Sequence, residues 1–200
     1  MLANTKPDTR SALLQAAEQI LVTRGVHALT VRKVGAVSGL NGTLITYHFG
    51  GIGSLLQELA MLNMQPMVAA WNAISSGNNP HQILQSWLSP LLNPAAFHPE
   101  ARALVVLDEI ASHGDSCQAR PVMDEMVKAG QKVEEALLPL LPHLDRQELH
   151  LRLRFIAGGT LGPPPRTPLI DKAAEFEIWP DEISLTRFAS CALSLPTQSQ

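Results

Sequence analysis

The sequence predicts an all-α fold of about nine helices, because apolar residues recur at spacings of three and four over most of its length. Glycine and proline divide the 200-residue chain into segments of the length that helices usually have. No run of β-branched or aromatic residues alternates with polar ones between turn signals, which argues against strands. We therefore expect a helical protein without a sheet.

The first helix is predicted over about 9–24. Apolar residues recur there at helical spacing, and Asp8 or Thr9 is a candidate N-cap. Gly25 is a candidate residue for the left-handed conformation that ends many helices. The first helix is thus bounded at both ends by residues suited to those positions.

Two shorter helices follow at once. Thr30 can cap a second helix over about 30–37, and Asn41 can cap a third that stops at Gly50-Gly51. Only a few residues separate the two helices. Three helices in so short a segment, the last two joined by a tight turn, form a helix-turn-helix unit, and we place this N-terminal domain at residues 1–52.

The remaining chain, residues 53–200, predicts a second domain that consists of helices. Its first helix runs from Gly53 to about Ser75, with a kink expected at Pro66. Further helices are expected over about 81–92, 99–113, 120–139, 145–159 and 181–194.

The formal net charge of −3 is unevenly distributed along the chain. Residues 1–50 carry five basic side chains against two acidic ones, a net charge of +3, which leaves −6 for the other 150 residues. A mildly basic end on an acidic body is the pattern of a DNA-contacting head joined to a trunk that does not touch DNA. The surplus is modest and carries little weight alone.

Several classes of protein are disfavoured by the sequence. No segment has the roughly 18 apolar residues of a membrane span, and the polar start of the chain lacks a secretory pattern, so we expect a cytoplasmic protein. Cys117 and Cys191 show no redox or metal spacing, and we expect both in the core. No nucleophile elbow or phosphate-cradling loop is present, so we expect neither enzyme activity nor a cofactor.

The N-terminal motifs resemble the TetR family of bacterial transcriptional regulators. The resemblance rests on Gly25, on the segments 29–34 and 38–41, and above all on Leu-Ile-Thr-Tyr-His-Phe-Gly at 44–50, followed by Leu55-Leu56. These motifs cover about a quarter of the chain. The resemblance implies a helix-turn-helix DNA-binding head and a C-terminal trunk that binds a ligand and dimerises.

A recognition helix reads base edges through its N-terminal residues, while neighbouring helix ends hold phosphates. The residues that we expect to face the major groove are Asn41, Gly42, Thr43 and Thr46. The residues that we expect to contact phosphates are Thr30, Arg32, Lys33, Tyr47 and His48. Thr30 has the alternative role of a simple N-cap. Because the groove-facing side chains are short, sequence reading would depend on hydroxyl contacts, thymine methyl packing and DNA shape.

The resemblance fails at one place. Family members usually carry a Lys and then an acidic residue after the Phe-Gly corner, whereas this chain has Ile52 and Gly53. That Lys would lie at a helix N-terminus that can meet a phosphate. Its absence predicts weaker, less salt-sensitive DNA binding, or phosphate contacts shifted to other residues of the head.

A single head of this size reads few base pairs, so specific binding calls for a dimer on a palindromic site. Apolar stripes on the last two helices could pair across a two-fold axis as a four-helix bundle. The expected interface residues are Leu149, Leu153, Ile156, Leu185, Phe188, Ala189 and Ala192. The alternative is that these stripes are buried within their own trunk.

The family resemblance also implies a small-molecule effector that changes the separation of the two heads. The candidate lining residues are Met61, Asn63, Met64, Met67, Trp71, Trp87, Phe97, His113, Met123 and Met126. Because most are apolar, we expect an apolar effector with few polar anchors. Each of these residues has the alternative role of plain core.

We therefore predict a dimeric, ligand-responsive DNA-binding repressor. The competing hypothesis is an all-α carrier of small molecules or lipids that does not bind DNA. A metal site formed by Glu109, His113 and Cys117 is disfavoured, because Gly114 should end their shared helix at His113.

Overall fold

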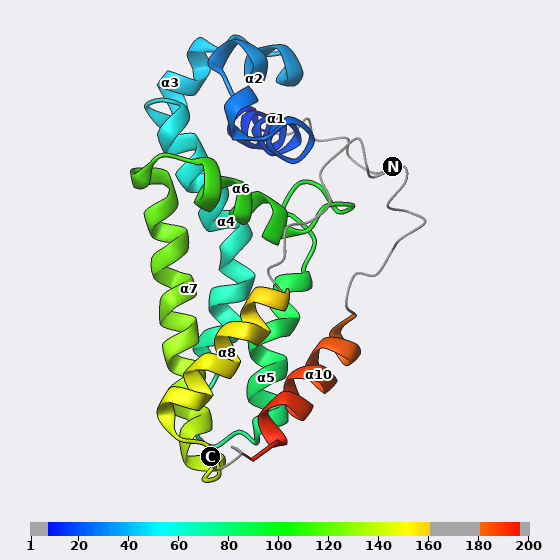
Figure 1. The fold of residues 1–200 in the computed structure, drawn as a ribbon. Coiled ribbons are helices and arrows are strands. Elements are labelled where there is room, and N and C mark those ends of the chain that lie inside the picture. Colours follow the sequence, from blue (N-terminus) through cyan, green and yellow to red (C-terminus); the bar gives the residue numbers. More distant parts are fainter. Residues whose placement is uncertain (1–7, 161–180, 197–200) are drawn as a thin grey trace. The chain divides into compact units, whose positions relative to one another are not determined.

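The structure is a computed structural model that describes residues 8–160 and 181–196. Over these two ranges it contains nine α-helices and three short 3₁₀ helices, and no strand (Figure 1). The prediction of an all-α fold is confirmed.

The N-terminal helices are α1 (Thr9–Arg24), the 3₁₀ turn η1 (Val26–Ala28), α2 (Val31–Ser38), α3 (Thr43–Phe49) and α4 (Ile52–Asn72). They are followed by α5 (Pro80–Leu88), η2 (Ser89–Leu92), α6 (Ala103–His113), α7 (Ser116–Leu137), η3 (Leu138–Leu140), α8 (Arg146–Thr160) and α10 (Glu182–Ser194). The predicted bounds of α1 are confirmed, and α6 ends at His113 as expected.

Two helix starts differ from the prediction by four residues each. The helix expected from 99 begins only at Ala103, since Pro94 and Arg102 form an isolated bridge just before it. The helix expected from 120 already begins at Ser116, where Asp115 accepts a hydrogen bond from the backbone N–H of Gln118 at 2.9 Å. Such a side-chain contact to the first turn is typical of a helix start.

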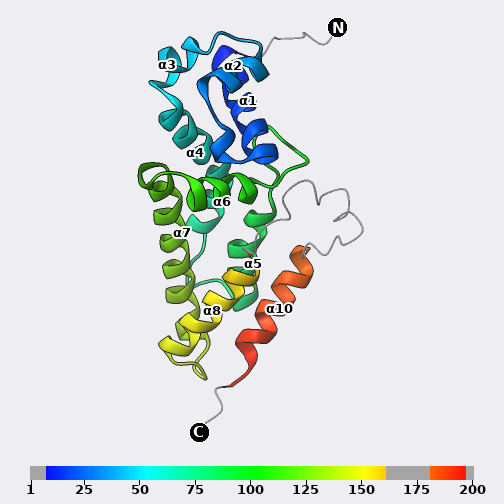
Figure 2. The same cartoon turned by 45° about the horizontal axis from the view of Figure 1, so that its top comes forward.

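The described residues pack into two compact units, which do not divide at the predicted boundary of 52/53. One unit, here called the head unit, holds the described residues up to Asn63 together with Pro94–Val122. The other, the trunk unit, holds Met64–Asn93 and the described residues from Met123 onward. Helix α6 therefore belongs with α1 and η1, which it contacts (Figure 2).

A buried polar network holds the head unit together. The carboxylate of Glu18 accepts hydrogen bonds from the Asn63 side chain at 2.8 Å and from the backbone N–H of Phe97 at 2.7 Å. The Asn63 oxygen accepts from the backbone N–H of Ala96 at 3.0 Å. Because both side chains are buried, these bonds satisfy groups that would otherwise lack a partner.

A second contact joins α6 to the turn after α1. The Glu109 carboxylate accepts a hydrogen bond from the backbone N–H of Val26 at 2.8 Å, and its Oε2 lies 3.6 Å from Nδ1 of His113. The preceding Gly25 has a φ of 77°, and a Cβ there would lie 2.7 Å from Oε1 of Glu109. Gly25 thus allows both the turn and the close approach of this carboxylate.

In the trunk unit, α10 packs against α5 and α8 (Figure 1). Asp181 caps α10 by accepting hydrogen bonds from the backbone N–H and the hydroxyl of Ser184, which hold the pKa of Asp181 below its ordinary value. The indole of Trp71 donates to the Trp87 carbonyl at 3.0 Å. The Trp71 bond joins the end of α4 to α5, whereas the Asp181 bonds stabilise only the start of α10.

The expectation that the two cysteines are core residues is wrong. Cys117 and Cys191 are both exposed free thiols. Cys117 lies in the first turn of α7, and Cys191 lies in the last turn of α10. Whether a helical cysteine is buried depends on which side of its helix it occupies, and local composition does not reveal that side.

Candidate nucleic-acid interface

The turn between α2 and α3 is built by close backbone packing. The Thr30 hydroxyl caps α2 by accepting from the backbone N–H of Lys33 at 3.2 Å, which confirms its capping role. A Cβ on Gly42 would lie 2.8 Å from Cγ1 of Val31 and 2.9 Å from its carbonyl oxygen. Gly42 is therefore required by the turn itself, and it lets α3 begin directly beside α2.

Helix α3 has one buried and one exposed side. Ile45 and Phe49 are buried against the rest of the head unit, while Thr43 and Thr46 are exposed. Tyr47 is 82% exposed, and its ring meets the His48 ring edge-on with the centroids 5.0 Å apart. The exposed side of α3 thus presents two hydroxyls, a phenol and an imidazole.

The side chain of Asn41 is already used within the turn. Its Oδ1 accepts a hydrogen bond from the backbone N–H of Thr43 at 3.0 Å. The residue as a whole is exposed. Asn41 can thus offer a donor to DNA while its oxygen stabilises the start of α3.

Arg10 fixes the far end of α3, a role that the sequence analysis missed. Its guanidinium pairs with both carboxylate oxygens of Glu58 on α4 and donates to the backbone carbonyl of His48 at 2.7 Å. It also lies over the Phe49 ring, 4.5 Å from the centroid. One cation therefore ties α1, α3 and α4 together, and its charge is used inside the protein.

The basic groups that remain near α3 are few. Arg32 is exposed on α2, and Lys33 is half-buried. Ile52 and Gly53 occupy the first turn of α4, so the position at which the family resemblance led us to expect a Lys is apolar here. Helix α3 itself contains neither Lys nor Arg. The surface is polar and only weakly basic.

The arrangement of α2, turn and α3 agrees with the result of sequence comparison. Residues 13–59 match the family model described as bacterial regulatory proteins, tetR family. This segment is thus similar to the N-terminal domain of the TetR family. The match covers α1 to α3 and the first part of α4, which are the elements that Arg10 and the Gly42 turn hold in place. No curated protein sequence matches the chain.

Solved structures of TetR-family regulators share the fold over nearly the whole chain. The regulator PfmR from Thermus thermophilus superposes with a TM-score of 0.67 at 14% identity, covering 97% of this chain and 100% of PfmR. A putative TetR-family regulator from Rhodococcus sp. gives a TM-score of 0.64 at 18% identity, with coverages of 92% and 96%. The multidrug binding protein EbrR superposes with a TM-score of 0.54 at 17% identity, covering 96% of this chain and 99% of EbrR. The chain thus has the fold of a TetR-family transcriptional regulator.

The structure does not gather the predicted effector-pocket residues in one unit. Met61, Asn63, Phe97 and His113 lie in the head unit, whereas Met64, Met67, Trp71, Trp87, Met123 and Met126 lie in the trunk unit. Asn63 has its amide and its oxygen engaged by the Glu18 network, and its role in an effector pocket stays a prediction. Met61 and Met123 are exposed.

The predicted interface residues are placed mainly in the core of the trunk unit. Five of the seven, Leu149, Leu153, Ile156, Leu185 and Ala189, are buried within the single chain. Ala192 is half-buried, and Phe188 is 62% exposed. The other sides of the same two helices carry exposed apolar side chains, namely Leu151 and Phe155 on α8 and Ile183 on α10.

Proposed function

We propose that the protein is a ligand-responsive transcriptional repressor that binds a palindromic operator as a dimer. The observation that carries the proposal is the exposed side of α3, where Thr43, Thr46 and Tyr47 project from a helix held on its inner side by Ile45 and Phe49. Side chains so placed can enter the major groove, with hydroxyls that contact bases or phosphates. The similarity of its N-terminal segment to the TetR family supports this assignment.

The residues predicted for DNA fall into two groups on this surface. Thr43, Thr46 and the amide of Asn41 lie on the exposed start of α3, where base edges are read. Tyr47 and Arg32 extend from the flanking surface and serve as phosphate contacts in our proposal. Gly42 acts by allowing the turn, so its contribution to DNA binding is indirect.

Electrophoretic retardation of the DNA that flanks its own gene, at low salt, tests the proposal. We expect a retarded band that Tyr47→Ala weakens and that Gln15→Ala, an exposed change on α1, leaves unchanged. Failure of the wild-type protein to retard any upstream fragment would overturn the regulator assignment in favour of a carrier. Equal behaviour of both variants would show that Tyr47 does not contact the DNA.

For the dimer, we propose a surface formed by the exposed apolar side chains Leu151, Phe155 and Phe188. Phe155 is 73% exposed, and large exposed apolar side chains that cluster on adjacent helices mark protein interfaces. Helices α8 and α10 contact each other, so their outer sides can form one patch. The two-fold pairing of such a patch gives the four-helix arrangement expected from the sequence.

Sedimentation velocity tests this surface. We expect the wild-type protein to sediment as a dimer and Phe155→Glu to shift it to a monomer, because a charge would be buried in the interface. Met123→Glu, another exposed apolar position, on α7, is the matched control and should remain a dimer. A dimeric Phe155→Glu protein would place the interface elsewhere.

We also propose that a small-molecule effector binds within the trunk unit. The trunk unit supplies buried, adaptable residues such as Met64, Met67 and Trp71. EbrR, whose structure is similar, is described as a multidrug binding protein, which supports a small-molecule ligand.

A repressor of this kind acts where DNA is, in the cytoplasm. Within the described part of the chain, no helix is both long and apolar enough to cross a membrane.

A further inference from the structure

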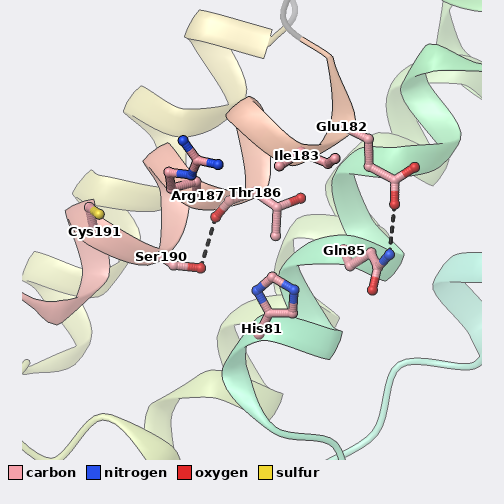
Figure 3. Close-up of a pocket in the computed structure, with 8 residues that line it drawn as sticks. All are labelled: His81, Gln85, Glu182, Ile183, Thr186, Arg187, Ser190 and Cys191. Carbon is pink, nitrogen blue, oxygen red and sulfur yellow. Dashed lines mark hydrogen bonds between the residues drawn. The ribbon is translucent and has the colours of Figure 1, made fainter.

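A pocket of ≈ 320 Å³ lies between α5 and α10 within the trunk unit (Figure 3). Its lining residues are His81, Gln85, Glu182, Ile183, Thr186, Arg187, Ser190 and Cys191. None of them belongs to the apolar set expected to hold the effector. The volume is at the lower end of the range of small-molecule sites, which indicates a compact ligand.

The central residue of the pocket has an unsatisfied polar group. Thr186 is 3% exposed, and its hydroxyl has no hydrogen-bond partner among the described residues. Threonine and serine within helices commonly donate to the carbonyl four residues earlier, as Thr160 does to Ile156 and Ser190 does to Thr186. The hydroxyl of Thr186 makes no such bond with the described chain. A buried hydroxyl without a partner is costly unless something else binds it.

The two ends of the pocket carry opposite charges. Glu182 lies on one side of Thr186 and Arg187 on the other, with His81 across from them on α5 (Figure 3). The Glu182 carboxylate is held in place by a hydrogen bond from the Gln85 amide at 2.7 Å, which leaves its second oxygen able to accept. Arg187 is exposed and makes no ion pair with a described residue, so its guanidinium can receive an anion.

We propose that this pocket binds a small amphoteric molecule of amino-acid size, which carries both an ammonium and a carboxylate group. Glu182 receives the ammonium group, Arg187 receives the carboxylate, and the Thr186 hydroxyl bonds the ligand between them. Ile183 supplies apolar contact for the carbon skeleton. The site goes beyond the repressor proposal and does not depend on it, because binding here can be measured without DNA.

Thermal unfolding of the wild-type protein with each of the twenty standard amino acids at millimolar concentration identifies a probe. We expect at least one to raise the unfolding temperature in a concentration-dependent way, since a ligand that binds only the folded state stabilises it. If none does so, the proposal is overturned.

Isothermal titration then compares three versions of the best probe. For leucine these would be leucine itself, 4-methylpentanoate, which lacks the amino group, and 3-methylbutylamine, which lacks the carboxylate. We expect each single-charge analogue to bind at least about tenfold more weakly, because each loses one charge-assisted contact. If 4-methylpentanoate bound as tightly as leucine, the pocket would be a simple anion site. If 3-methylbutylamine bound as tightly as leucine, it would be a simple cation site. Either result contradicts the proposal.

Three variants connect binding to the named residues. Thr186→Val keeps the shape and removes the unsatisfied hydroxyl, so it should weaken binding about tenfold while leaving the unfolding temperature of the ligand-free protein unchanged or higher. Glu182→Gln and Arg187→Gln should each weaken binding by a similar factor. Glu135→Gln and Arg154→Gln, exposed positions on α7 and α8, are the matched charge controls. Affinity that is unchanged in Thr186→Val, or equal losses in the controls, would overturn the assignment.

Discussion

Arg10 of α1 pairs with both carboxylate oxygens of Glu58 on α4, and the same guanidinium reaches the carbonyl of His48 near the end of α3. The pair is partly exposed, with 43% of the Arg10 side chain and 30% of the Glu58 side chain accessible, so solvent weakens its electrostatic contribution. The main effect of Arg10 is to hold three helices in place, because α1, α3 and α4 all meet at its planar guanidinium group. The orientation of α3 depends on this cation.

Replacing Arg10 by methionine should therefore destabilise the protein and loosen α3. We expect a loss of about 1–2 kcal/mol in the free energy of unfolding, measured by urea denaturation, because the carbonyl of His48 and the Glu58 carboxylate both lose a donor. Arg10→Lys should recover only part of this, since lysine cannot make the paired contact. An unchanged free energy for Arg10→Met would show that the clamp is not needed.

Tyr47 should contribute to DNA binding and not to stability. Its ring is 82% exposed, so Tyr47→Ala removes little packing, and we expect less than about 0.5 kcal/mol of change in unfolding. Operator affinity should fall by a similar factor for every sequence tested, because phosphate contacts carry no sequence information. Fluorescence anisotropy with operator and scrambled duplexes checks this, and a loss confined to the operator would contradict the role.

Thr46 should show the opposite pattern. Thr46→Ala removes a hydroxyl from the exposed side of α3, and we expect altered preference at one or two base pairs with nearly constant binding to scrambled DNA. Selection of binding sites from a randomised pool, compared between variant and wild type, measures that preference. Thr23→Ala, an exposed position at the end of α1, serves as the control. An identical selected sequence would remove Thr46 from the reading residues.

Introducing a lysine at the start of α4 should strengthen DNA binding. Ile52→Lys places a cation in the first turn of a helix close to the end of α3, and we expect the slope of log K against log salt to steepen by about 1. Ser54→Lys adds the same charge to an exposed position of the same turn. If both variants steepen the slope equally, the effect is one of general charge and position 52 has no special geometry.

Asn63 should be among the residues most sensitive to substitution in the head unit. Asn63→Ala leaves the buried Glu18 carboxylate with one fewer donor and the backbone N–H of Ala96 without its acceptor, and we expect a loss of about 3 kcal/mol. Urea denaturation measures it, with Asn72→Ala, an exposed asparagine of the same helix, as the control. Equal stability of the two variants would contradict the network's role.

The sequence predicted the helices well because their ends depend on local chemistry. Gly25, with a φ of 77°, ends α1 where expected, and Thr30 caps α2 as its residue type suggests. The start of α6 was placed too early because Pro99 resembles a helix start, although the chain stays extended at Arg102. Local signals thus predicted the elements but not every boundary.

Contacts between distant residues could not be predicted in the same way. Leu149 and Phe155 lie on one amphipathic helix, and the pattern does not say which side faces the chain's own core; Leu149 is buried and Phe155 exposed. The Asn63 side chain contacts the carboxylate of Glu18, 45 residues earlier in the chain. The Arg10 side chain contacts that of Glu58, 48 residues later. The sequence could identify Tyr47 as a candidate DNA contact, because a short helix such as α3 buries few of its side chains and leaves the others exposed.

The hydrogen bond from the backbone N–H of Val26 to Glu109 sets a practical limit on how this chain can be recombined with proteins of similar fold. A chimera that joins residues 1–52 to a foreign trunk would lose this acceptor, and Glu18 would lose the donor that it finds in the backbone of Phe97. The transferable module is therefore discontinuous: a specificity graft has to carry residues 94–122 along with the first 63. Domain exchange at the motif boundary would cut through a single folded body.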